Sequence, residues 1–313
     1  MNILITGASG FTGRAMIRFL ASKGNVRIAG LARKNDPSLI RSSRVSWYFT
    51  DIHDPEPLTK VVTSAEPDAV LHLAGLTHGT LPELRAANVD GTRNVLDAIH
   101  QANPCPVLVI SSSAVYGFAG TAPIPEEQTL TPVSDYGTSK VEQEAVCQNY
   151  MRSGHGAIAI ARPFNLIGPG QPDSFVCGRI IRQVIEMEKK TRSALDLLET
   201  GSFRDFIDVR DVVEGYWSIL SHPDFSAACS GKIFNLGSGN PRSITDVIQI
   251  IGTLTGVQYP VRLPDKPVPV LVPYQKSDNS RIESATGWKP AISLQDSLSD
   301  MLTAAQEQAF HTP

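Results

Sequence analysis

Short apolar runs alternate with longer segments of helical period along the first half of the chain. The runs are rich in β-branched residues and almost uninterrupted, as is typical of strands buried on both faces of a parallel sheet. Strands are predicted at residues 2–6, 26–32, 45–49, 69–73, 107–111 and 157–161, and helices at 12–23, 57–65, 84–102 and 140–152. This alternation predicts an α/β fold, a doubly wound parallel sheet of Rossmann type whose right-handed crossovers cover both faces.

The second half of the chain is less regular. Helices are predicted at residues 174–190, 209–220, 244–255 and 294–307. Five prolines stand between residues 260 and 273, and each removes a backbone donor and obstructs the preceding helical turn. That segment is therefore expected to be extended and to run across the surface near a ligand.

Composition narrows the classes of partner. The chain has 313 residues, of which 42% are hydrophobic, and 28 Lys and Arg stand against 31 Asp and Glu, so its net charge is −3. This balance argues against a nucleic-acid partner. No apolar stretch approaches the roughly 20 residues needed to cross a bilayer, so no membrane partner is expected either.

The cysteines and the amino terminus indicate a cytoplasmic protein. The opening sequence MNILITG is too short and too soon interrupted by glycine to form the apolar region of a signal peptide. The four cysteines lack metal-like spacing and are predicted to be reduced, mostly buried thiols: Cys105, Cys147, Cys177 and Cys229. No metal site is predicted.

A glycine-rich turn, TGASGFTG at residues 6–13, follows the first predicted strand and leads into a helix. Gly7 would permit the tight turn, Gly10 would let the backbone approach a pyrophosphate, and Gly13 would let the helix pack closely on the sheet. The strand–turn–helix context favours a dinucleotide site over a structural turn. The predicted contacts are Gly7, Ser9, Gly10, Phe11, Thr12 and Gly13.

The end of the second strand indicates which dinucleotide is bound. NAD-binding folds usually place an acidic residue there for the ribose 2′-hydroxyl, whereas this chain has Arg33 and Lys34. Two cations favour the 2′-phosphate of NADP(H), with NAD(H) as the alternative, although both side chains could simply be solvated. Asp51 and Ile52, after the third strand, are candidates for holding the adenine, and Asp51 could equally cap the next helix.

A second constellation combines a serine-rich strand end with a tyrosine and a lysine. Ser111 and Ser112 follow the fifth strand, and Lys140 lies four residues after Tyr136, on the same face of the predicted helix. A nearby ammonium favours the phenolate and would lower the pKa of Tyr136. The Ser112 hydroxyl could stabilise charge on a substrate oxygen. Tyr–Lys pairs are common on helices, but the added serines and glycine turn make coincidence a poor explanation.

Taken together, these motifs resemble those of the extended short-chain dehydrogenase/reductases, in particular the members that act on nucleotide-sugars. The matches cover nearly the whole chain: residues 6–13, 51–52, 72–75, 88–92, 111–116, Tyr136 with Lys140, 162–165, 204–209, 234–237 and 287–290. The resemblance implies that Tyr136 is the acid/base, that Lys140 holds the ribose and tunes Tyr136, and that Ser112 polarises the substrate.

The same resemblance implies further site residues and a division of the chain. Further cofactor contacts are implied for Leu73, Ala74, Gly75, Asn88, Ser111 and Arg162, and substrate contacts for Thr77, Ser113, Asn165, Arg182 and Arg204, the two arginines binding a diphosphate. Residues 1–165, with a return segment near 205–237, would form the dinucleotide-binding domain, and 166–204 with 238–313 the nucleotide-sugar lobe. A homodimer joined through the helices at 88–102 and 136–152 is also implied.

Substitutions within the motifs narrow the reaction. Sugar 4,6-dehydratases carry Asp and Glu after the catalytic hydroxyl, and the epimerase–reductase that makes GDP-fucose carries a cysteine at the position of Ala114. Here Ser113 and Ala114 follow Ser112, so neither chemistry is favoured. Simple 4-keto reduction, or 4-epimerisation through a transient ketone, is left.

Residues 162–176, followed by Arg182, resemble the corresponding run of GDP-4-dehydro-6-deoxy-D-mannose reductases, which implies a GDP-linked 4-keto-6-deoxyhexose as substrate. One departure is that Lys266 stands in the extended segment where this group usually has an arginine. A 4-epimerase is the main alternative, and a non-catalytic dinucleotide sensor is a second, which the intact Ser112, Tyr136 and Lys140 set disfavours. His72 is expected to be structural, and His78 lies in the loop expected to contact the sugar.

Overall fold

A seven-stranded parallel sheet forms the centre of the computed structural model, which describes residues 1–37 and 39–311. Its strand order is β11-β6-β5-β4-β1-β2-β3, and every neighbouring pair is parallel. The strands are β1 (Asn2–Thr6), β2 (Arg27–Ala32), β3 (Val45–Phe49), β4 (Ala69–His72), β5 (Val107–Ile110), β6 (Ile158–Pro163) and β11 (Ile233–Leu236). The predicted doubly wound fold is confirmed. Chain order reverses between β1 and β4, and ligands of open α/β sheets bind at such a switch point.

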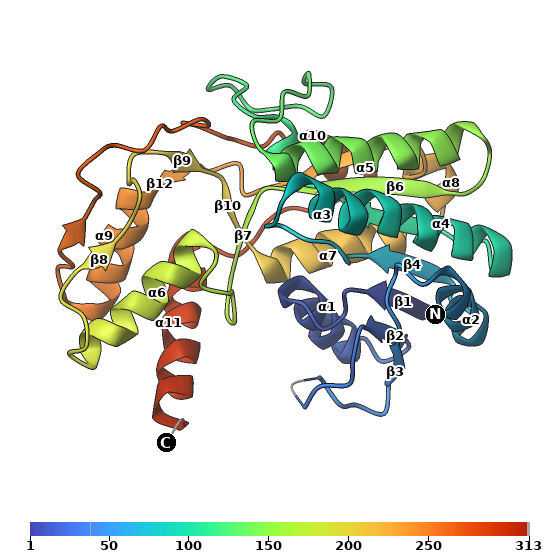
Figure 1. Cartoon of the computed structure of the whole chain (residues 1–313), viewed down its shortest axis with the longest axis horizontal. Coiled ribbons are helices and arrows are strands. Elements are labelled where there is room, and N and C mark those ends of the chain that lie inside the picture. The colour runs from blue at the N-terminus through green and yellow to red at the C-terminus, as the bar shows by residue number, and fades with distance from the viewer. Residues whose placement is uncertain (38, 312–313) are drawn as a thin grey trace.

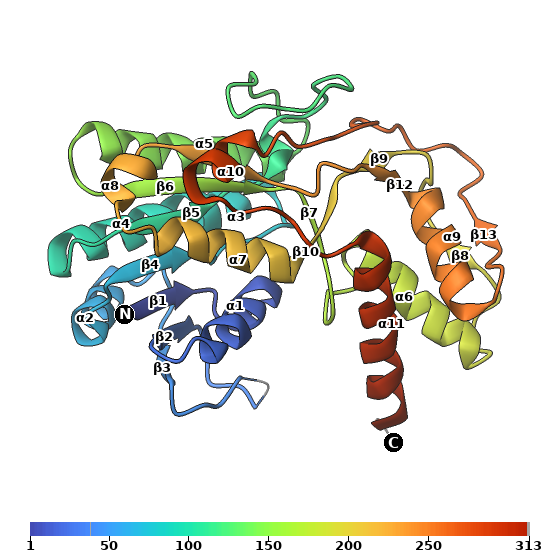
Figure 2. The same ribbon diagram turned by 180° about the vertical axis from the view of Figure 1, so that it is seen from behind.

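Helices cover both faces of this sheet (Figures 1 and 2). Side chains of Ile3 and Ile5 point into one apolar layer with α1 (Phe11–Ser22) and α7 (Val209–Leu220). Leu4, on the opposite face, packs with α2 (Pro55–Ala65), α4 (Gly91–Ala102) and α5 (Asp135–Arg152). Because alternate strand residues are buried on opposite faces, the strands are continuously apolar, which is why the sequence identified them.

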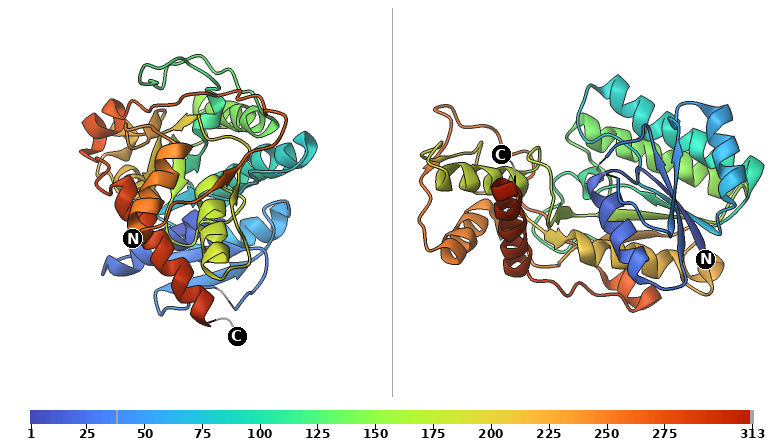
Figure 3. Two further views of the ribbon diagram at one scale, coloured as in Figure 1. Left: turned by 90° about the vertical axis from the view of Figure 1, so that its left-hand side faces the viewer. Right: turned by 90° about the horizontal axis from the view of Figure 1, so that it is seen from below.

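A smaller lobe lies beside the carboxyl ends of the strands, and Figure 3 shows it joined to the sheet by connecting segments. Its apolar cluster joins α6 (Val176–Glu188), α9 (Ile244–Thr255) and α11 (Leu294–His311). Three two-stranded pairs accompany it: β7 (Asn165–Ile167) with β10 (Phe206–Asp208), β9 (Phe203–Arg204) with β12 (Arg242–Ser243), and β8 (Leu195–Asp196) with β13 (Val261–Arg262). The domain boundaries given above stay a prediction.

Two predicted helices differ in detail from the structure. The segment predicted as one helix at 84–102 comprises α3 (Leu81–Arg85), a π-helical turn (Ala86–Asp90) and α4. Helix α5 begins at Asp135, earlier than predicted, because the Ser134 hydroxyl accepts a hydrogen bond from the Gly137 N–H at 3.1 Å and caps it. The earlier start places Tyr136 and Lys140 on one helix.

The remaining elements are short, and the proline-rich segment is extended as predicted. Helical turns occur at η2 (Ser113–Val115), α8 (Phe225–Ala228) and α10 (Ser280–Thr286). Residues 260–271 are exposed and have no regular structure apart from β13. Within the described residues, no helix is long and apolar enough to cross a membrane.

Candidate active site

The glycine turn between β1 and α1 is shaped to receive a phosphate. Gly7 has a φ of +66°, and a Cβ there would lie 2.8 Å from the backbone nitrogen of Ala74. A Cβ on Gly13 would lie 2.4 Å from the Gly7 oxygen, so the helix packs directly against the turn. Gly10 occupies the cap position of α1, and no side chain bonds to the helix's first N–H groups. These N–H groups are therefore available to an anion.

Arg14 is a cation of this turn that sequence reasoning missed. It lies on the first turn of α1, and its guanidinium donates a hydrogen bond of 2.8 Å to the Ser9 carbonyl. The contact fixes the turn and keeps a positive charge beside it. A cation directly after a glycine-rich turn is a signal that the sequence does contain.

The end of β2 presents the two predicted cations. Arg33 and Lys34 are exposed and form no ion pair with any residue that the structure describes. Partial burial raises the pKa of Asp51. The hydrogen bonds from His53 and the charges of His53 and Arg33 outweigh this effect, so the pKa of Asp51 is lowered overall. Asp54, not Asp51, occupies the N-cap position of α2, and its side chain forms no capping hydrogen bond; Asp51 accepts the His53 backbone N–H at 3.0 Å.

Asn88 holds the loop that follows β4. Its amide oxygen accepts the Leu76 N–H at 2.8 Å, and its amide nitrogen donates to the Leu76 carbonyl at 3.0 Å and to the Ser139 hydroxyl at 2.9 Å. Asn88 is buried, and these contacts use its amide within the protein. The structure thus gives this side chain a positioning role, and its direct contact with the cofactor stays a prediction. Leu73 and Ala74 are partly buried at the start of the loop, and a Cβ on Gly75 would lie 3.8 Å from the Lys140 ammonium.

Ser112, Tyr136 and Lys140 meet beside this loop. The Ser112 hydroxyl is hydrogen-bonded to Tyr136, and the Lys140 nitrogen lies 5.9 Å from the centre of the tyrosine ring. Burial raises the pKa of Tyr136, which the bond to Ser112 only partly offsets. The prediction that Lys140 lowers this pKa is wrong for this state, because burial dominates and the ammonium is directed at other acceptors.

The Lys140 ammonium is held by a series of hydrogen-bonded polar groups in the interior of the protein. Its ammonium donates to the Ile110 carbonyl at 2.8 Å and to the Gln143 amide oxygen at 2.9 Å. The Gln143 amide nitrogen donates to the Thr92 hydroxyl at 2.8 Å, and Thr92 donates to the Asn88 carbonyl at 2.6 Å. Burial lowers the pKa of Lys140 to about 8. Two of the three ammonium hydrogens are used, which leaves one for a further acceptor.

His72 belongs to the same series of buried polar groups and has a structural role. Its ring nitrogens lie 2.7 Å from the Thr6 hydroxyl and 2.9 Å from the Thr92 hydroxyl. Burial lowers its pKa to about 3, so the ring is neutral. The expected structural role of His72 is thereby supported by its contacts.

Ser111 and Arg162 belong to a different buried network. The Ser111 hydroxyl donates to a Glu144 oxygen at 2.5 Å, and Arg162 binds the same carboxylate through two nitrogens at 2.8 and 2.6 Å. Arg162 also donates to the Tyr116 hydroxyl at 2.8 Å and to the Glu126 carbonyl at 2.9 Å. These side chains anchor α5 to β5 and β6. The cofactor contacts expected of these two residues stay a prediction.

The predicted substrate residues occupy several positions around the carboxyl ends of the strands. Ser113 is buried in η2, and its carbonyl accepts the Gln275 amide at 3.2 Å. Asn165 is the first residue of β7, and its backbone N–H donates a hydrogen bond to the Asp205 carbonyl at 3.0 Å. The Thr77 hydroxyl is 2.8 Å from His78, whose ring meets Phe175 edge-on at 5.9 Å. The loop after β4 therefore touches the residue that caps α6.

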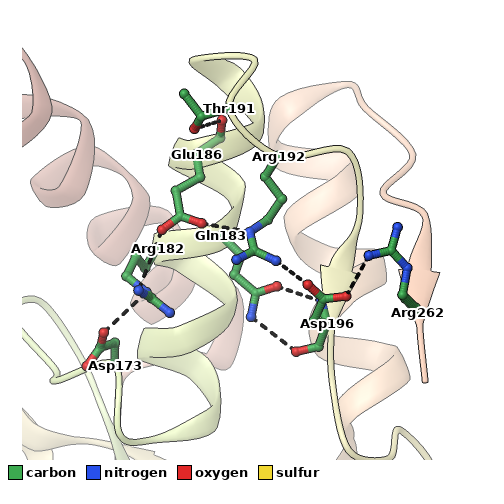
Figure 4. Close-up of polar contacts among 8 residues, drawn as sticks. All are labelled: Asp173, Arg182, Gln183, Glu186, Thr191, Arg192, Asp196 and Arg262. Atoms are coloured by element: carbon green, nitrogen blue, oxygen red, sulfur yellow. Dashed lines mark hydrogen bonds and ion pairs between the residues drawn. The ribbon is translucent and has the colours of Figure 1, made fainter. Parts of the chain in front are cut away.

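Arg182, which is predicted to bind a diphosphate, forms ion pairs with acidic residues of the lobe. It pairs with Asp173 at 3.2 Å and with Glu186 at 3.6 Å, and lines a hollow between α6 and α11. Figure 4 shows these contacts continuing through Arg192 and Asp196 to Arg262, with charges alternating in sign. Arg182 is thus neutralised within the lobe. Arg204, in β9, has no ion pair among the described residues.

The cysteines supply no alternative catalytic group. Cys147, Cys177 and Cys229 are buried and Cys105 is partly buried, and all four are unpaired, as predicted. Burial raises the pKa of Cys147 and Cys177 to about 12, which keeps them as thiols. No cluster of three His, Cys, Asp or Glu side chains suited to a metal occurs in the part of the chain that the structure describes.

A glycine turn at a helix terminus, together with a buried lysine and a partly buried tyrosine and serine, is the arrangement expected from the resemblance. Residues 3–237 match the NAD dependent epimerase/dehydratase family. The chain belongs to this family. The resemblance to extended short-chain dehydrogenase/reductases is thereby confirmed.

Known family members resemble the chain over almost its full length. GDP-6-deoxy-D-mannose reductase of Pseudomonas aeruginosa is 30% identical over 323 aligned residues, covering 96% of each chain. The structure of RMD from Pseudomonas aeruginosa complexed with NADPH matches with a TM-score of 0.84 and 30% identity, covering 98% of this chain and 99% of that one. UDP-glucuronic acid 4-epimerase from Bacillus cereus, in complex with UDP-glucuronic acid and NAD, gives 0.88 at 25% identity, covering 98% and 100%. The relatives are nucleotide-sugar enzymes of two reaction types.

Proposed function

We propose that the protein reduces the 4-keto group of a nucleotide-linked 4-keto-6-deoxyhexose with NADPH. The observation that carries the proposal is the cluster of the partly buried Ser112 and Tyr136 with the buried Lys140, beside which Ser113 and Ala114 offer neither a carboxylate nor a thiol. Such a site can polarise and protonate a carbonyl oxygen, and it has no further acid or base for dehydration. The 30% identity to a GDP-6-deoxy-D-mannose reductase supports the same reaction.

The glycine turn and the ends of the strands fit the cofactor. Gly7, Ser9, Gly10, Phe11, Thr12 and Gly13 would hold the pyrophosphate against α1. Arg33 and Lys34 would bind the 2′-phosphate, Asp51 and Ile52 the adenine, and Leu73, Ala74 and Gly75 would line the same edge. NADPH is favoured over NADH, because the two exposed cations form no ion pair with a described residue and the 30% identical RMD is complexed with NADPH.

Tyr136, Ser112 and Lys140 each have a separate role in the proposed reduction. The bound nicotinamide supplies a hydride to C4. Tyr136 donates its proton to the carbonyl oxygen, and the raised pKa of Tyr136 keeps that proton in place until the oxygen becomes basic. Ser112 stabilises the oxygen through a hydrogen bond, and the remaining ammonium hydrogen of Lys140 binds the ribose.

The nucleotide-sugar would lie between the strand ends and the lobe. Thr77, Ser113 and Asn165 are proposed to contact the sugar or nucleoside, and Arg204 the diphosphate. A GDP-linked substrate is favoured by the sequence of residues 162–176 and by the relative named for it. Arg182 is a weaker candidate for the diphosphate, because it already pairs with Asp173 and Glu186.

A 4-epimerase is the second candidate. It is favoured by the TM-score of 0.88 to the UDP-glucuronic acid 4-epimerase, and it would use the same three residues. A dinucleotide sensor would need no such set and is disfavoured. The two enzymes differ in one respect, because the reductase releases oxidised cofactor whereas the epimerase returns the cofactor unchanged.

NADPH absorbance tests the proposal directly. Wild-type protein with GDP-4-keto-6-deoxymannose is expected to consume NADPH, and Tyr136→Phe is expected to lower the rate by about 10²–10⁴-fold, because the proton donor is lost. Tyr150→Phe, on the same helix but bonded to Asp97, is the matched control and should retain activity. Interconversion of two nucleotide-sugars without loss of absorbance would replace the reductase by the epimerase.

Two further assignments belong to this proposal. A homodimer joined through α4 and α5 is expected from the family resemblance. The cytoplasm is the expected compartment, consistent with four cysteines that are all unpaired.

A further inference from the structure

Two arginines face each other across a short ribbon in the lobe. In the antiparallel pair of β9 and β12, Arg204 lies directly opposite Arg242. Side chains of directly opposed residues project from the same face, with Cβ atoms about 5 Å apart. Figures 1 and 2 show β9 and β12 side by side next to β10, the strand that leads back to the main sheet. Two guanidinium groups are thus brought together near the junction of lobe and sheet.

Neither arginine has an ion-pair partner among the residues that the structure describes. The nearest acid that acts on Arg204 is Glu199, whose carboxylate already accepts hydrogen bonds from the backbone and hydroxyl of Ser202. Like charges directly opposite each other destabilise a strand pair. Three other lobe arginines, Arg182, Arg192 and Arg262, each pair with a carboxylate.

The backbone around the pair is rigidly held. The buried Asp205 carboxylate, directly after Arg204, accepts five hydrogen bonds: from the backbone and hydroxyl of Ser238, the backbone of Gly239, and the backbone and hydroxyl of Ser277, at 2.6, 2.6, 3.1, 2.8 and 2.7 Å. Ser238 and Gly239 lie only a few residues before Arg242. The fold therefore keeps two residues of like charge in register, an arrangement suited to a ligand of opposite charge.

Other cations are poorly suited to join Arg204. Arg182 is neutralised, and Lys266 lies in the exposed proline-rich segment. Lysine also offers only a point charge, whereas arginine binds phosphate oxygens through two nitrogens.

We infer that Arg242 is the second cation of a diphosphate-binding pair with Arg204, an assignment that rests on the proposed nucleotide-sugar substrate. The pair places two planar guanidinium groups on one face, one for each phosphate. The sequence resemblance indicated Arg204 and Arg182, and gave no sign of Arg242. Arg242 becomes a binding residue only through its register with β9.

Stability measured with and without ligand tests this inference. Thermal unfolding would be followed for wild type, Arg242→Ala, Arg242→Lys and Arg262→Ala, alone and with GDP, UDP or the corresponding nucleoside. Arg242→Ala should be as stable as wild type or more stable without ligand, because repulsion is relieved, and should lose most of the stabilisation by the diphosphate. Its Kd for that diphosphate should rise about tenfold or more, with binding of the nucleoside and NADPH unchanged.

The control variants separate charge from geometry. Arg262→Ala removes one positive charge from the same lobe and should bind the diphosphate like wild type, since its exposed pair with Asp196 contributes little. Arg242→Lys should lie between wild type and Arg242→Ala.

The outcomes also separate this inference from the proposed function. Unchanged diphosphate binding by Arg242→Ala overturns the inference and leaves the reductase standing, as does a loss of stability in the ligand-free variant with no change in ligand affinity. Arg242-dependent binding in a protein that never oxidises NADPH overturns the reductase alone. Wild-type protein that binds neither GDP nor UDP contradicts both.

Discussion

At the residue scale, the site depends on an ammonium group that is buried at some cost. Burial lowers the pKa of Lys140 to about 8, while Ile110 and Gln143 fix two of its hydrogens. An uncharged acceptor such as the Gln143 amide orients the ammonium without raising its pKa as a carboxylate would. The charge on Lys140 is therefore expected to be lost within the range in which activity is usually measured.

The pH profile tests this arrangement. Below pH 8 Lys140 is protonated, so kcat/KM for NADPH should be constant there and fall above about 8 as the ribose-binding charge disappears. Gln143→Glu places a carboxylate at the ammonium and should move this alkaline limb to higher pH. Gln143→Met, which removes the amide without adding charge, is the control and should not raise it. An alkaline limb that does not move in Gln143→Glu would show that another group controls it.

A second residue-scale prediction concerns cofactor choice. Arg33→Ala should lower kcat/KM for NADPH about tenfold and leave that for NADH nearly unchanged, because only the 2′-phosphate contact is lost. Arg18→Ala removes an exposed arginine from the outer part of α1 and serves as the control. An unchanged preference for NADPH over NADH in Arg33→Ala would remove the argument for NADPH from the end of β2.

At the element scale, a buried ion pair and a hydrogen bond attach α5 to the central sheet. The Glu144–Arg162 pair is almost wholly buried, with 2% and 3% of the respective side chains exposed, and it joins α5 to β6, while Ser111 adds a bond from the end of β5. Tyr136 lies about two turns and Lys140 about one turn before Glu144 on this helix. The pair thus fixes the part of the helix that carries the acid/base.

Breaking this pair should destabilise the protein more than removing it. Arg162→Met leaves the Glu144 carboxylate buried and unpaired, and should lower the free energy of unfolding by about 3–5 kcal/mol. Adding Glu144→Leu to this variant should recover part of the loss. Urea unfolding measures both values, and a double variant as unstable as the sum of the single ones would contradict a direct pairing.

The elements that the sequence predicted are those whose signal is local. Six sheet strands are continuous apolar runs, and the glycine turn and the Tyr136–Lys140 spacing are read within a few residues. β7, β9, β10 and β12 are two or three residues long and exist only through partners distant in sequence. For the same reason the sequence did not predict the protein partners of Asn88, Ser111 and Arg162, which lie far from them along the chain.

At the scale of the whole molecule, the proposed site is formed by the carboxyl edge of the central sheet together with the smaller lobe. The sheet supplies the glycine turn and the acid/base set, and the lobe supplies the unpaired arginines opposite one another on β9 and β12. Helices α4 and α5 cover the sheet face away from α1 and α7, and this face is the one proposed for dimer formation.

Solution mass tests the proposed dimer. Light scattering should give about twice the chain mass of 33.8 kDa. Arg93→Glu reverses an exposed charge on α4 and should shift the protein towards monomer, whereas Arg18→Glu makes the same charge change on α1 and should not. A wild-type monomer, or an equal response to the two variants, would contradict this interface.

The fate of the hydride tests the central claim most directly. NADPH carrying deuterium at the transferred position of its nicotinamide would be incubated with GDP-4-keto-6-deoxymannose, and the product analysed by NMR and mass spectrometry. We expect one deuterium at C4 of the sugar for each NADPH oxidised, and almost none with Tyr136→Phe in the same time. A product without deuterium, or a sugar epimerised at C4 while the cofactor is recovered in its original state, would contradict the assignment as a reductase.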